Sequence, residues 1–234
     1  MRVLIISDGH GDVDQLDRIA AIAESADFVL FGGDFAALGQ PETGQPFLKR
    51  LAALHDRVFA VTGNCDEMDF RDTLDEYDIG IEGSLSYYNG LILTGSGGAS
   101  VFTGDTPNER ADEELVGDLR LVAESVPEDS PNAAGAWNNL VVIMHNPPKD
   151  TALDIVGKDA HVGSPLLRAF IETYQPLLVV SGHIHESAAV DAIGTTALVN
   201  PGSLAEGRYA VAEISGGRTQ PFAVTSIELK QLSV

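Results

Sequence analysis

Residues 2–10 read Arg-Val-Leu-Ile-Ile-Ser-Asp-Gly-His, an apolar run that leads directly into two polar residues around a glycine. The uninterrupted run predicts a strand over residues 2–7 that is buried on both faces, as in a parallel sheet. Residues 13–26 then place apolar side chains at helical spacing behind acidic first-turn residues, which predicts an amphipathic helix. A buried strand followed by such a helix indicates an α/β fold.

The same unit continues along the chain. A predicted strand at 27–31 ends at Gly33-Asp34, and another at 57–61 ends at Gly63-Asn64 after a predicted helix near 43–54. This β-α-β-α-β order implies parallel strands joined by right-handed crossovers. The C-terminal ends of these strands therefore share one edge of the sheet, where ligand sites of parallel sheets collect.

Two later predicted strands end at histidines. A strand at 139–144 leads to His145, and a strand at 177–181, after a helix at 164–173, leads to Gly182-His183-Ile184-His185. The Gly-His-any-His motif is the most specific one, because the chain has only 6 histidines. Any single residue of this kind could instead cap a helix, hold a turn or sit in the core. Five such motifs in order, each after a strand, indicate one shared site.

The remaining segments are less regular. Asn89-Gly90 between short strands at 84–88 and 91–95 is a hairpin signal, and a helix is expected at about 109–124. Residues 97–100 indicate a rim loop, and the polar residues 126–138 indicate a surface loop. Strand-like pieces separated by glycine turns predict an antiparallel second sheet at 187–193, 195–199, 208–214 and 220–229. We expect two sheets packed face to face with helices outside, in a single domain over residues 1–234.

The composition restricts the biological setting. Asp and Glu total 35 against 14 Lys and Arg, which gives a net charge of −21 and makes nucleic acid an unexpected partner, because phosphate binding needs a basic surface. Apolar residues make up 44% of the chain in regular blocks, which excludes a disordered chain. The acidity is typical of a cytoplasmic protein from a salt-accumulating halophile, or else of an ordinary acidic enzyme. One Cys, no signal peptide and no apolar span of membrane length favour a cytoplasmic location without membrane contact.

Seven residues at the strand ends are candidate metal ligands: Asp8, His10, Asp34, Asn64, His145, His183 and His185. Side chains two apart on an extended backbone point the same way, which pairs Asp8 with His10 and His183 with His185. Mixed carboxylate and imidazole ligands suit Mn²⁺, Fe²⁺, Zn²⁺, Co²⁺ or Ni²⁺ better than Ca²⁺. Two such ions, about 3.5 to 4 Å apart, can clamp a phosphate and generate a hydroxide nucleophile.

Together these motifs resemble those of the calcineurin-like metallophosphoesterase superfamily, namely Asp-any-His, Gly-Asp, Gly-Asn-His-Asp/Glu, a lone His and Gly-His-any-His. The resemblance extends from Asp8 to the Asn200-Pro201-Gly202-Ser203 turn, and it implies a four-layer α-β-β-α sandwich with two mixed β-sheets. It also implies a first metal on Asp8, His10 and His185, a second on Asn64, His145 and His183, and a bridge at Asp34. Among its members the chain is most similar to small prokaryotic Icc-related phosphoesterases.

One position departs from the superfamily pattern. Gly63-Asn64-Cys65-Asp66 stands where most members have Gly-Asn-His-Asp, so the histidine that is thought to contact the phosphate and protonate the leaving group is missing. A thiol beside two dications could have a lowered pKa and would then be a poor proton donor. Similarity to phosphodiesterases with the same variant implies a diesterase without a strong general acid. Alternatively, Cys65 is a small packed residue.

The resemblance therefore implies a hydrolase for a small phosphoester that uses two divalent ions, with Mn²⁺ expected. Its catalytic residues would be Asp34, Asn64, Cys65 and His145. A phosphomonoesterase and a non-catalytic scaffold on the same fold are the alternatives. The missing histidine counts against the first, and the complete ligand set counts against the second. His161 either reaches the substrate phosphate from its loop or lies on the surface.

Overall fold

Five strands form the first sheet, in the order β15-β14-β1-β2-β3. The computed structural model describes residues 1–125, 137–217 and 219–233. Three strands are parallel: β1 (Arg2–Ile6), β2 (Phe28–Phe31) and β3 (Val58–Ala60). The other two are antiparallel to their neighbours: β14 (Arg208–Gly217) and β15 (Gln220–Gln231). This mixed sheet brings the C-terminal ends of β1, β2 and β3 to one edge, as predicted.

The second sheet has six strands, in the order β12-β13-β11-β8-β5-β4. Its four inner strands are parallel: β5 (Leu91–Ser96), β8 (Leu140–Met144), β11 (Leu178–Val180) and β13 (Thr196–Asn200). The two outer strands pair antiparallel with their neighbours: β4 (Ser86–Tyr88) and β12 (Ala189–Ile193). The turn at Asn89-Gly90 joins β4 to β5, as the hairpin signal predicts.

The prediction that the last four strands form a separate antiparallel sheet is wrong. β12 and β13 extend the second sheet, with β13 parallel to β11, whereas β14 and β15 extend the first. The reason lies in burial. In β14, Val211 packs into the core under the helices and Ala210 into the core between the sheets, so this strand is covered on both faces. A strand of that kind suits a sheet that has a hydrophobic core on each face, as the first sheet has.

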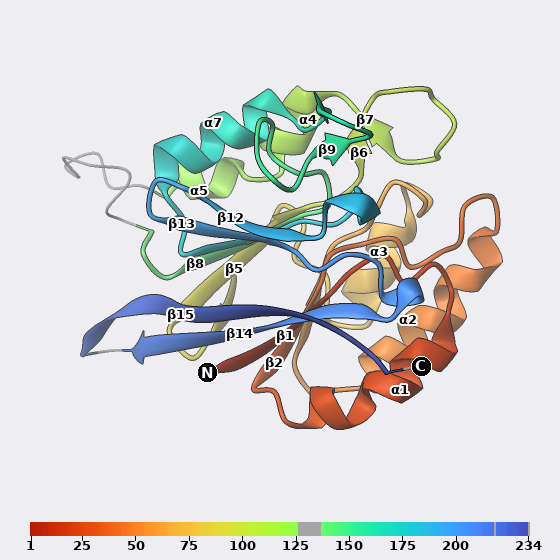
Figure 1. Ribbon diagram of the computed structural model, residues 1–234, viewed down its shortest axis with the longest axis horizontal. Coiled ribbons are helices and arrows are strands. Elements are labelled where there is room, and N and C mark those ends of the chain that lie inside the picture. Colours follow the sequence, from red (N-terminus) through yellow and green to blue (C-terminus); the bar gives the residue numbers. More distant parts are fainter. Residues whose placement is uncertain (126–136, 218, 234) are drawn as a thin grey trace.

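Helices cover the outer face of each sheet, so the molecule has four layers, α-β-β-α (Figure 1). The first sheet is covered by α1 (Val13–Glu24), α2 (Gly44–Ala52) and α3 (Phe70–Glu76), and the second by α4 (Asp112–Gly117), α5 (Arg120–Glu124) and α7 (Pro165–Tyr174). β1 contributes side chains to two hydrophobic cores, one on each face of the sheet. Leu4 and Ile6 pack under the helices, whereas Val3 and Ile5 pack between the sheets. The four-layer architecture that the resemblance implied is confirmed.

The shorter elements modify two predictions. The helix expected at 109–124 is a short strand β7 (Glu109–Arg110) followed by α4 and α5, and the expected rim loop contains β6 (Ala99–Ser100), which pairs with β7. Residues 126–136 of the expected polar loop lie outside the described residues. Trp137, which also belongs to the expected loop at 126–138, is 5% exposed and packs into the outer core of the second sheet.

The remaining short elements lie in loops: the hairpin of β9 (Ile155–Val156) with β10 (Ala160–His161), and the 3₁₀ turns η1 (Pro41–Thr43), η2 (His185–Ser187) and η3 (Leu204–Glu206). Among the described residues, no helix combines the length and the apolar character needed to cross a membrane.

Candidate metal centre

Turns with an unusual backbone carry the candidate ligands at the strand ends. Asp8, His10, Asp34 and His183 have positive φ angles of 56°, 45°, 61° and 66°. Residues with a Cβ rarely adopt this left-handed conformation, and where they do, the site is often functional. His183 is likewise in the left-handed region, so the alternation argument is wrong for the His183–His185 pair as well as for Asp8 and His10, which are not on an extended backbone. The two side chains meet because the turn folds them toward each other.

Asp8, His10 and His185 form one group of potential ligands. One ligand atom from each residue lies within 4.8 Å of the other two. Nε2 of His185 lies 3.1 Å from Nε2 of His10 and 3.1 Å from Oδ1 of Asp8. Two ligand atoms that are each about 2.1 Å from one ion, at about a right angle, are about 3 Å apart. The spacing of this group fits a single divalent ion.

Asn64, His145 and His183 form a second group. Oδ1 of Asn64 lies 2.9 Å from Nε2 of His145 and 2.7 Å from Nδ1 of His183. Nδ1 of His145 lies 2.7 Å from the carbonyl oxygen of Gly32. A carbonyl can only accept, so Nδ1 carries the proton of the neutral ring and Nε2 directs a lone pair at the Asn64 oxygen. Two acceptors that face each other fit a cation between them.

Asp34 lies between the two groups. Its Oδ2 is 3.9 Å from Nε2 of His10, and its Oδ1 is 3.6 Å from Nε2 of His145. The side chain is buried, and burial together with the charge of Asp8 raises the pKa of its carboxyl. Each oxygen of one carboxylate thus faces a different ligand group, which is the arrangement that a bridging ligand requires.

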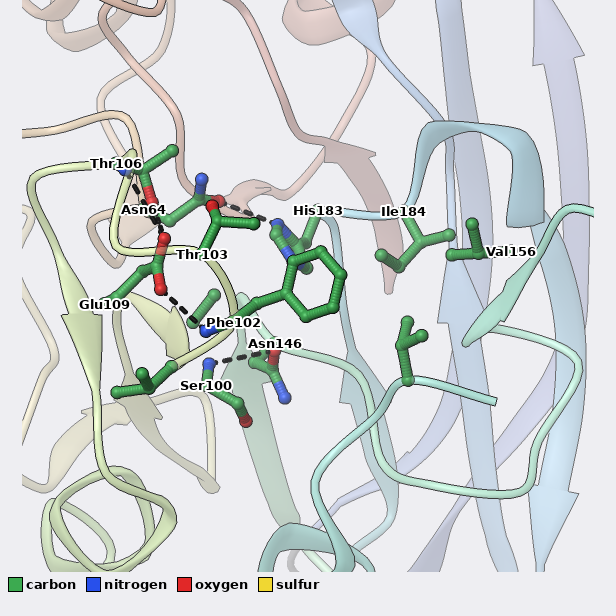
Figure 2. A pocket seen from close by; sticks show the side chains of 13 residues that line it. Asn64, Ser100, Phe102, Thr103, Thr106, Glu109, Asn146, Val156, His183 and Ile184 are labelled. Carbon is green, nitrogen blue, oxygen red and sulfur yellow. Dashed lines mark hydrogen bonds between the residues drawn. The ribbon is translucent and has the colours of Figure 1, made fainter. Parts of the chain in front are cut away.

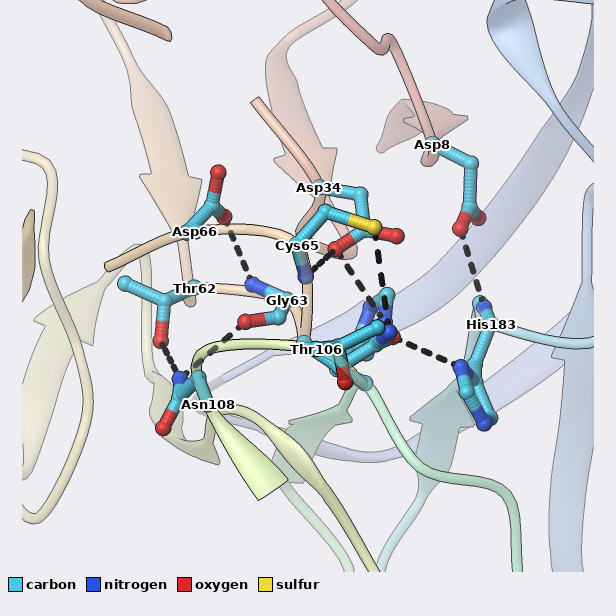
Figure 3. Close-up of polar contacts among 12 residues, drawn as sticks. Asp8, Asp34, Thr62, Gly63, Cys65, Asp66, Thr106, Asn108 and His183 are labelled. Atoms are coloured by element: carbon cyan, nitrogen blue, oxygen red, sulfur yellow. Dashed lines mark hydrogen bonds and ion pairs between the residues drawn. The ribbon is translucent and has the colours of Figure 1, made fainter. Parts of the chain in front are cut away.

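The charges at this rim also fit cations. Burial opposes ionisation of Asp8, but the hydrogen bond from His185 and the charge of that ring outweigh it and lower the pKa of the Asp8 carboxyl. Oδ2 of Asp8 is buried and has no hydrogen-bond partner among the described residues. A buried carboxylate oxygen without a partner is costly unless a cation or a donor reaches it. Figure 3 shows the backbone N–H of His183 donating a hydrogen bond to the Asp8 carboxylate.

Two of the candidate ligands, His145 and His183, are in the protonation state that metal binding needs. Burial lowers the pKa of His145, and burial lowers the pKa of His183 to about 4, so both rings are neutral at neutral pH. His185 behaves differently. Burial opposes its protonation, but the hydrogen bond and charge of Asp8 raise its pKa. A cation bound in place of that proton would satisfy the same carboxylate.

Cys65 lies against this centre with its thiol mostly buried. Its backbone N–H donates to Oδ1 of Asp34 at 2.8 Å, and its Sγ lies 3.7 Å from Nδ2 of Asn64. Burial and the charge of Asp34 raise the pKa of the Cys65 thiol. The surrounding protein therefore favours the protonated thiol. Two dications nearby were expected to have the opposite effect and to lower this pKa.

Asp66 supports the candidate site through hydrogen bonds, a role that the sequence analysis did not single out. Its buried carboxylate accepts backbone N–H groups from Gly63 at 2.7 Å, Ala36 at 2.8 Å and Phe35 at 3.2 Å. Burial and the charge of Asp34 raise its pKa to about 6. The side chain ties the turn after β2 to the turn after β3, and so holds Asp34 beside Asn64. The signal in the sequence that could have indicated this role is the presence of an acidic residue in the turn that begins at Gly63.

Asn108, which is distant in sequence, forms hydrogen bonds to the same turn after β3. Its buried Nδ2 donates to the carbonyl oxygen of Gly63 at 3.0 Å and to Oγ1 of Thr62 at 3.1 Å (Figure 3). No local pattern around Asn108 indicated this role. Gly63 itself is required there, because a Cβ at that position would lie 2.0 Å from Oδ1 of Asp34.

His161 is not brought to the metal-ligand groups. It lies in the β9–β10 hairpin, where its Nδ1 is 2.7 Å from Oδ1 of the buried Asp154. Asp154 also accepts backbone N–H groups of Thr151 and Gly163. The arrangement favours a structural role for His161 within its hairpin over contact with a substrate phosphate.

Comparisons with known proteins agree with this geometry. A family model described as calcineurin-like phosphoesterase matches residues 1–187. An uncharacterized protein of Methanocaldococcus jannaschii is 32% identical over 207 residues, which cover 86% of this chain and 88% of that protein.

Two solved structures share the fold. A protein of Thermus thermophilus superposes with a TM-score of 0.71 at 17% identity, over 99% of both chains. The NAD nucleotidase of Haemophilus influenzae superposes with a TM-score of 0.57 at 9% identity, over 99% of this chain and 50% of that one. At these identities the likeness concerns the fold alone.

Proposed function

This chain belongs to the calcineurin-like phosphoesterase family, and from that premise we propose that it hydrolyses small phosphodiesters at a binuclear metal centre. The observation that carries the proposal is the position of Asp34, whose two oxygens face two separate groups of potential ligands. The unpartnered oxygen of Asp8 gives further support, because it leaves a buried negative charge that a cation would balance.

The residues divide into two proposed metal sites. Asp8, His10 and His185 would hold the first ion, Asn64, His145 and His183 the second, and Asp34 would bridge them. The family uses divalent metals, and the mixed carboxylate and imidazole set supports Mn²⁺, with Fe, Zn, Co or Ni as alternatives. When bound, two such ions neutralise the phosphate and activate a water molecule. The chain's own contribution is to hold the imidazole and carboxylate ligands in place.

The preference for diesters rests on Cys65. A thiol whose pKa is raised by burial is a weak acid, so it gives a departing alkoxide little help. This supports hydrolysis of esters with good leaving groups. A non-catalytic scaffold is disfavoured, because the potential ligands lie together with the spacing of a ligand shell.

The net charge of −21 supports a small-molecule substrate rather than nucleic acid. It also supports a salt-rich cytoplasm as the setting, where salt screens repulsion between surface carboxylates. A melting temperature that rises from low salt to molar KCl would agree with this setting. A flat response would contradict it without affecting the enzymatic proposal.

The direct test is a substrate screen of protein reconstituted with Mn²⁺ in molar KCl. We expect two bound ions per chain, and faster hydrolysis of bis-p-nitrophenyl phosphate than of alkyl phosphomonoesters, with cyclic nucleotides included as candidate natural substrates. A stoichiometry of one ion or none contradicts the binuclear centre. Faster hydrolysis of alkyl monoesters contradicts the diester preference and identifies a phosphomonoesterase.

A further inference from the structure

A cavity of about 230 Å³ opens directly beside the proposed second metal site. Asn64 and His183 line it, and Figure 2 shows Phe102, Ile184 and Val156 around it. We propose that this cavity binds the organic ester group of the substrate and selects a compact, uncharged group about the size of one ring, with Phe102 as a specificity residue. The inference rests on the proposed function and names the substrate class.

The chemistry of the lining argues for an uncharged group. Its walls are mostly apolar: Ala99, Val101, Phe102, Val156, Val162 and Ile184. Among the described residues that line it there is no Lys or Arg, so a second phosphate or a carboxylate of the substrate would find no positive charge on the walls. Glu109 also lines the cavity, and backbone hydrogen bonds, first that of Phe102, lower its pKa to about 2. Its negative charge disfavours anions further.

The volume argues for a small group. Pockets that bind drug-sized molecules measure about 300 to 1,000 Å³, and this cavity is smaller. A single ring or a compact aliphatic group fits that space, whereas an extended ligand does not. Because two proposed metal ligands, Asn64 and His183, line the cavity, a group bound there could be joined through one ester oxygen to a phosphate on the metals.

Phe102 is placed to contact such a group. Its side chain is 85% exposed, although the ring extends toward His183 and Ile184 (Figure 2). The backbone around it is anchored, because Oε2 of Glu109 accepts the N–H of Phe102 at 2.7 Å and that of Gly104 at 3.0 Å. The ring is thus held at the cavity without being buried by the protein. A ligand ring stacked on it would remove apolar surface from water.

The test uses two ligands that cannot be hydrolysed, phenylphosphonate and methylphosphonate, titrated calorimetrically into the Mn²⁺-loaded protein. We expect phenylphosphonate to bind about tenfold more tightly, since contacts of one aromatic ring account for a difference of that size. Phe102→Ala should remove most of this advantage and leave methylphosphonate within about twofold of its original affinity. Because Phe102 is exposed, its truncation is not expected to affect folding.

Two further variants make the test specific. Tyr87→Ala removes an aromatic ring that is 72% exposed on β4 and does not line the cavity, so both affinities should remain unchanged. Val162→Phe enlarges another lining side chain, which narrows the cavity, and should weaken the binding of phenylphosphonate alone.

The outcomes separate the two proposals. If the loaded protein hydrolyses esters and binds methylphosphonate, but phenylphosphonate has no advantage or keeps it in Phe102→Ala and Val162→Phe, the cavity inference is overturned and the proposed function stands. If the loaded protein hydrolyses no phosphoester and binds neither phosphonate, the proposed function fails, and the inference fails with it.

Discussion

The rim that carries the candidate ligands and the cavity wall beside it are built in opposite ways. At the rim, Asp8, Asp34 and His145 are buried, and two of the three have left-handed backbone conformations. On the wall, Val101 and Phe102 are 65% and 85% exposed, and their loop is held through backbone hydrogen bonds to Glu109.

The difference follows from what each region has to do. Metal ligands must be held within a few tenths of an ångström, which requires fixed rotamers and a hydrogen-bonded support around them. An apolar wall contributes area, which depends little on exact position. Substitutions at the rim should therefore abolish the chemistry, whereas substitutions on the wall should change only which substrates are accepted.

The largest effect is expected at Asp34. Asp34→Asn removes the charge that faces both ligand groups, so we expect a loss of metal and a fall in activity of more than about 100-fold. Metal analysis and hydrolysis of an aryl diester measure both. Asp14→Asn, at an exposed carboxylate of α1, is the control and should change neither. Full activity in Asp34→Asn would contradict the expectation that substitutions at the rim, unlike those on the wall, abolish the chemistry.

Substitution of Asp66 tests whether metal binding at the rim depends on the hydrogen bonds that Asp66 makes to the turns after β2 and β3. Asn at this position turns an amide N–H₂ toward the backbone N–H groups that the carboxylate now accepts, so donors would face donors. We expect Asp66→Asn to lower metal affinity by about 10- to 100-fold and to lower the melting temperature. Asp69→Asn, at an exposed position, is the matched control. Unchanged metal affinity would mean that the turns hold their shape without Asp66.

Substitutions of Cys65 test whether this residue of the rim controls protonation of the leaving group. Cys65→His introduces an imidazole that can donate a proton, so the rate on alkyl monoesters relative to aryl diesters should rise by about tenfold, part of the range known for general acids. Cys65→Ser keeps the size of the side chain and should leave this ratio close to that of the natural protein. If Cys65→His binds both metals and the ratio stays constant, Cys65 is a packing residue.

The smallest effect is expected at His161, on the hairpin next to the wall. The hydrogen bond to Asp154 raises the pKa of His161 above its usual 6.5. A raised histidine pKa stabilises the fold fully below 6.5, and this stabilisation is lost as the pH rises through the folded-state value. His161→Gln should therefore lower the melting temperature by about 1 to 2 °C near pH 6 and not at pH 9. An equal effect at both pH values would exclude the ion pair as its cause.

The order of strands and helices at the start of the chain and the seven candidate ligands could be predicted from the sequence. Both depend on local information. The period of apolar residues distinguishes buried strands from amphipathic helices, and parallel strands bring their C-terminal ends to one edge whatever the details of packing. For this reason motifs as distant as Asp8 and His185 could be assigned to one place. Their metal-binding roles remain a prediction.

Only the tertiary structure decided how the sheets share their strands, how the turns are supported and where the cavity lies. β14 joins the first sheet because both of its faces are buried by other segments, which its own sequence does not specify. Asp66 and Asn108 support the β3 turn through hydrogen bonds that include the backbone of Ala36 and of Gly63, respectively. Phe102 lines a cavity with Val156 and His183, which come from separate parts of the chain. Contacts between residues far apart in sequence leave no local pattern, so only the folded chain shows them.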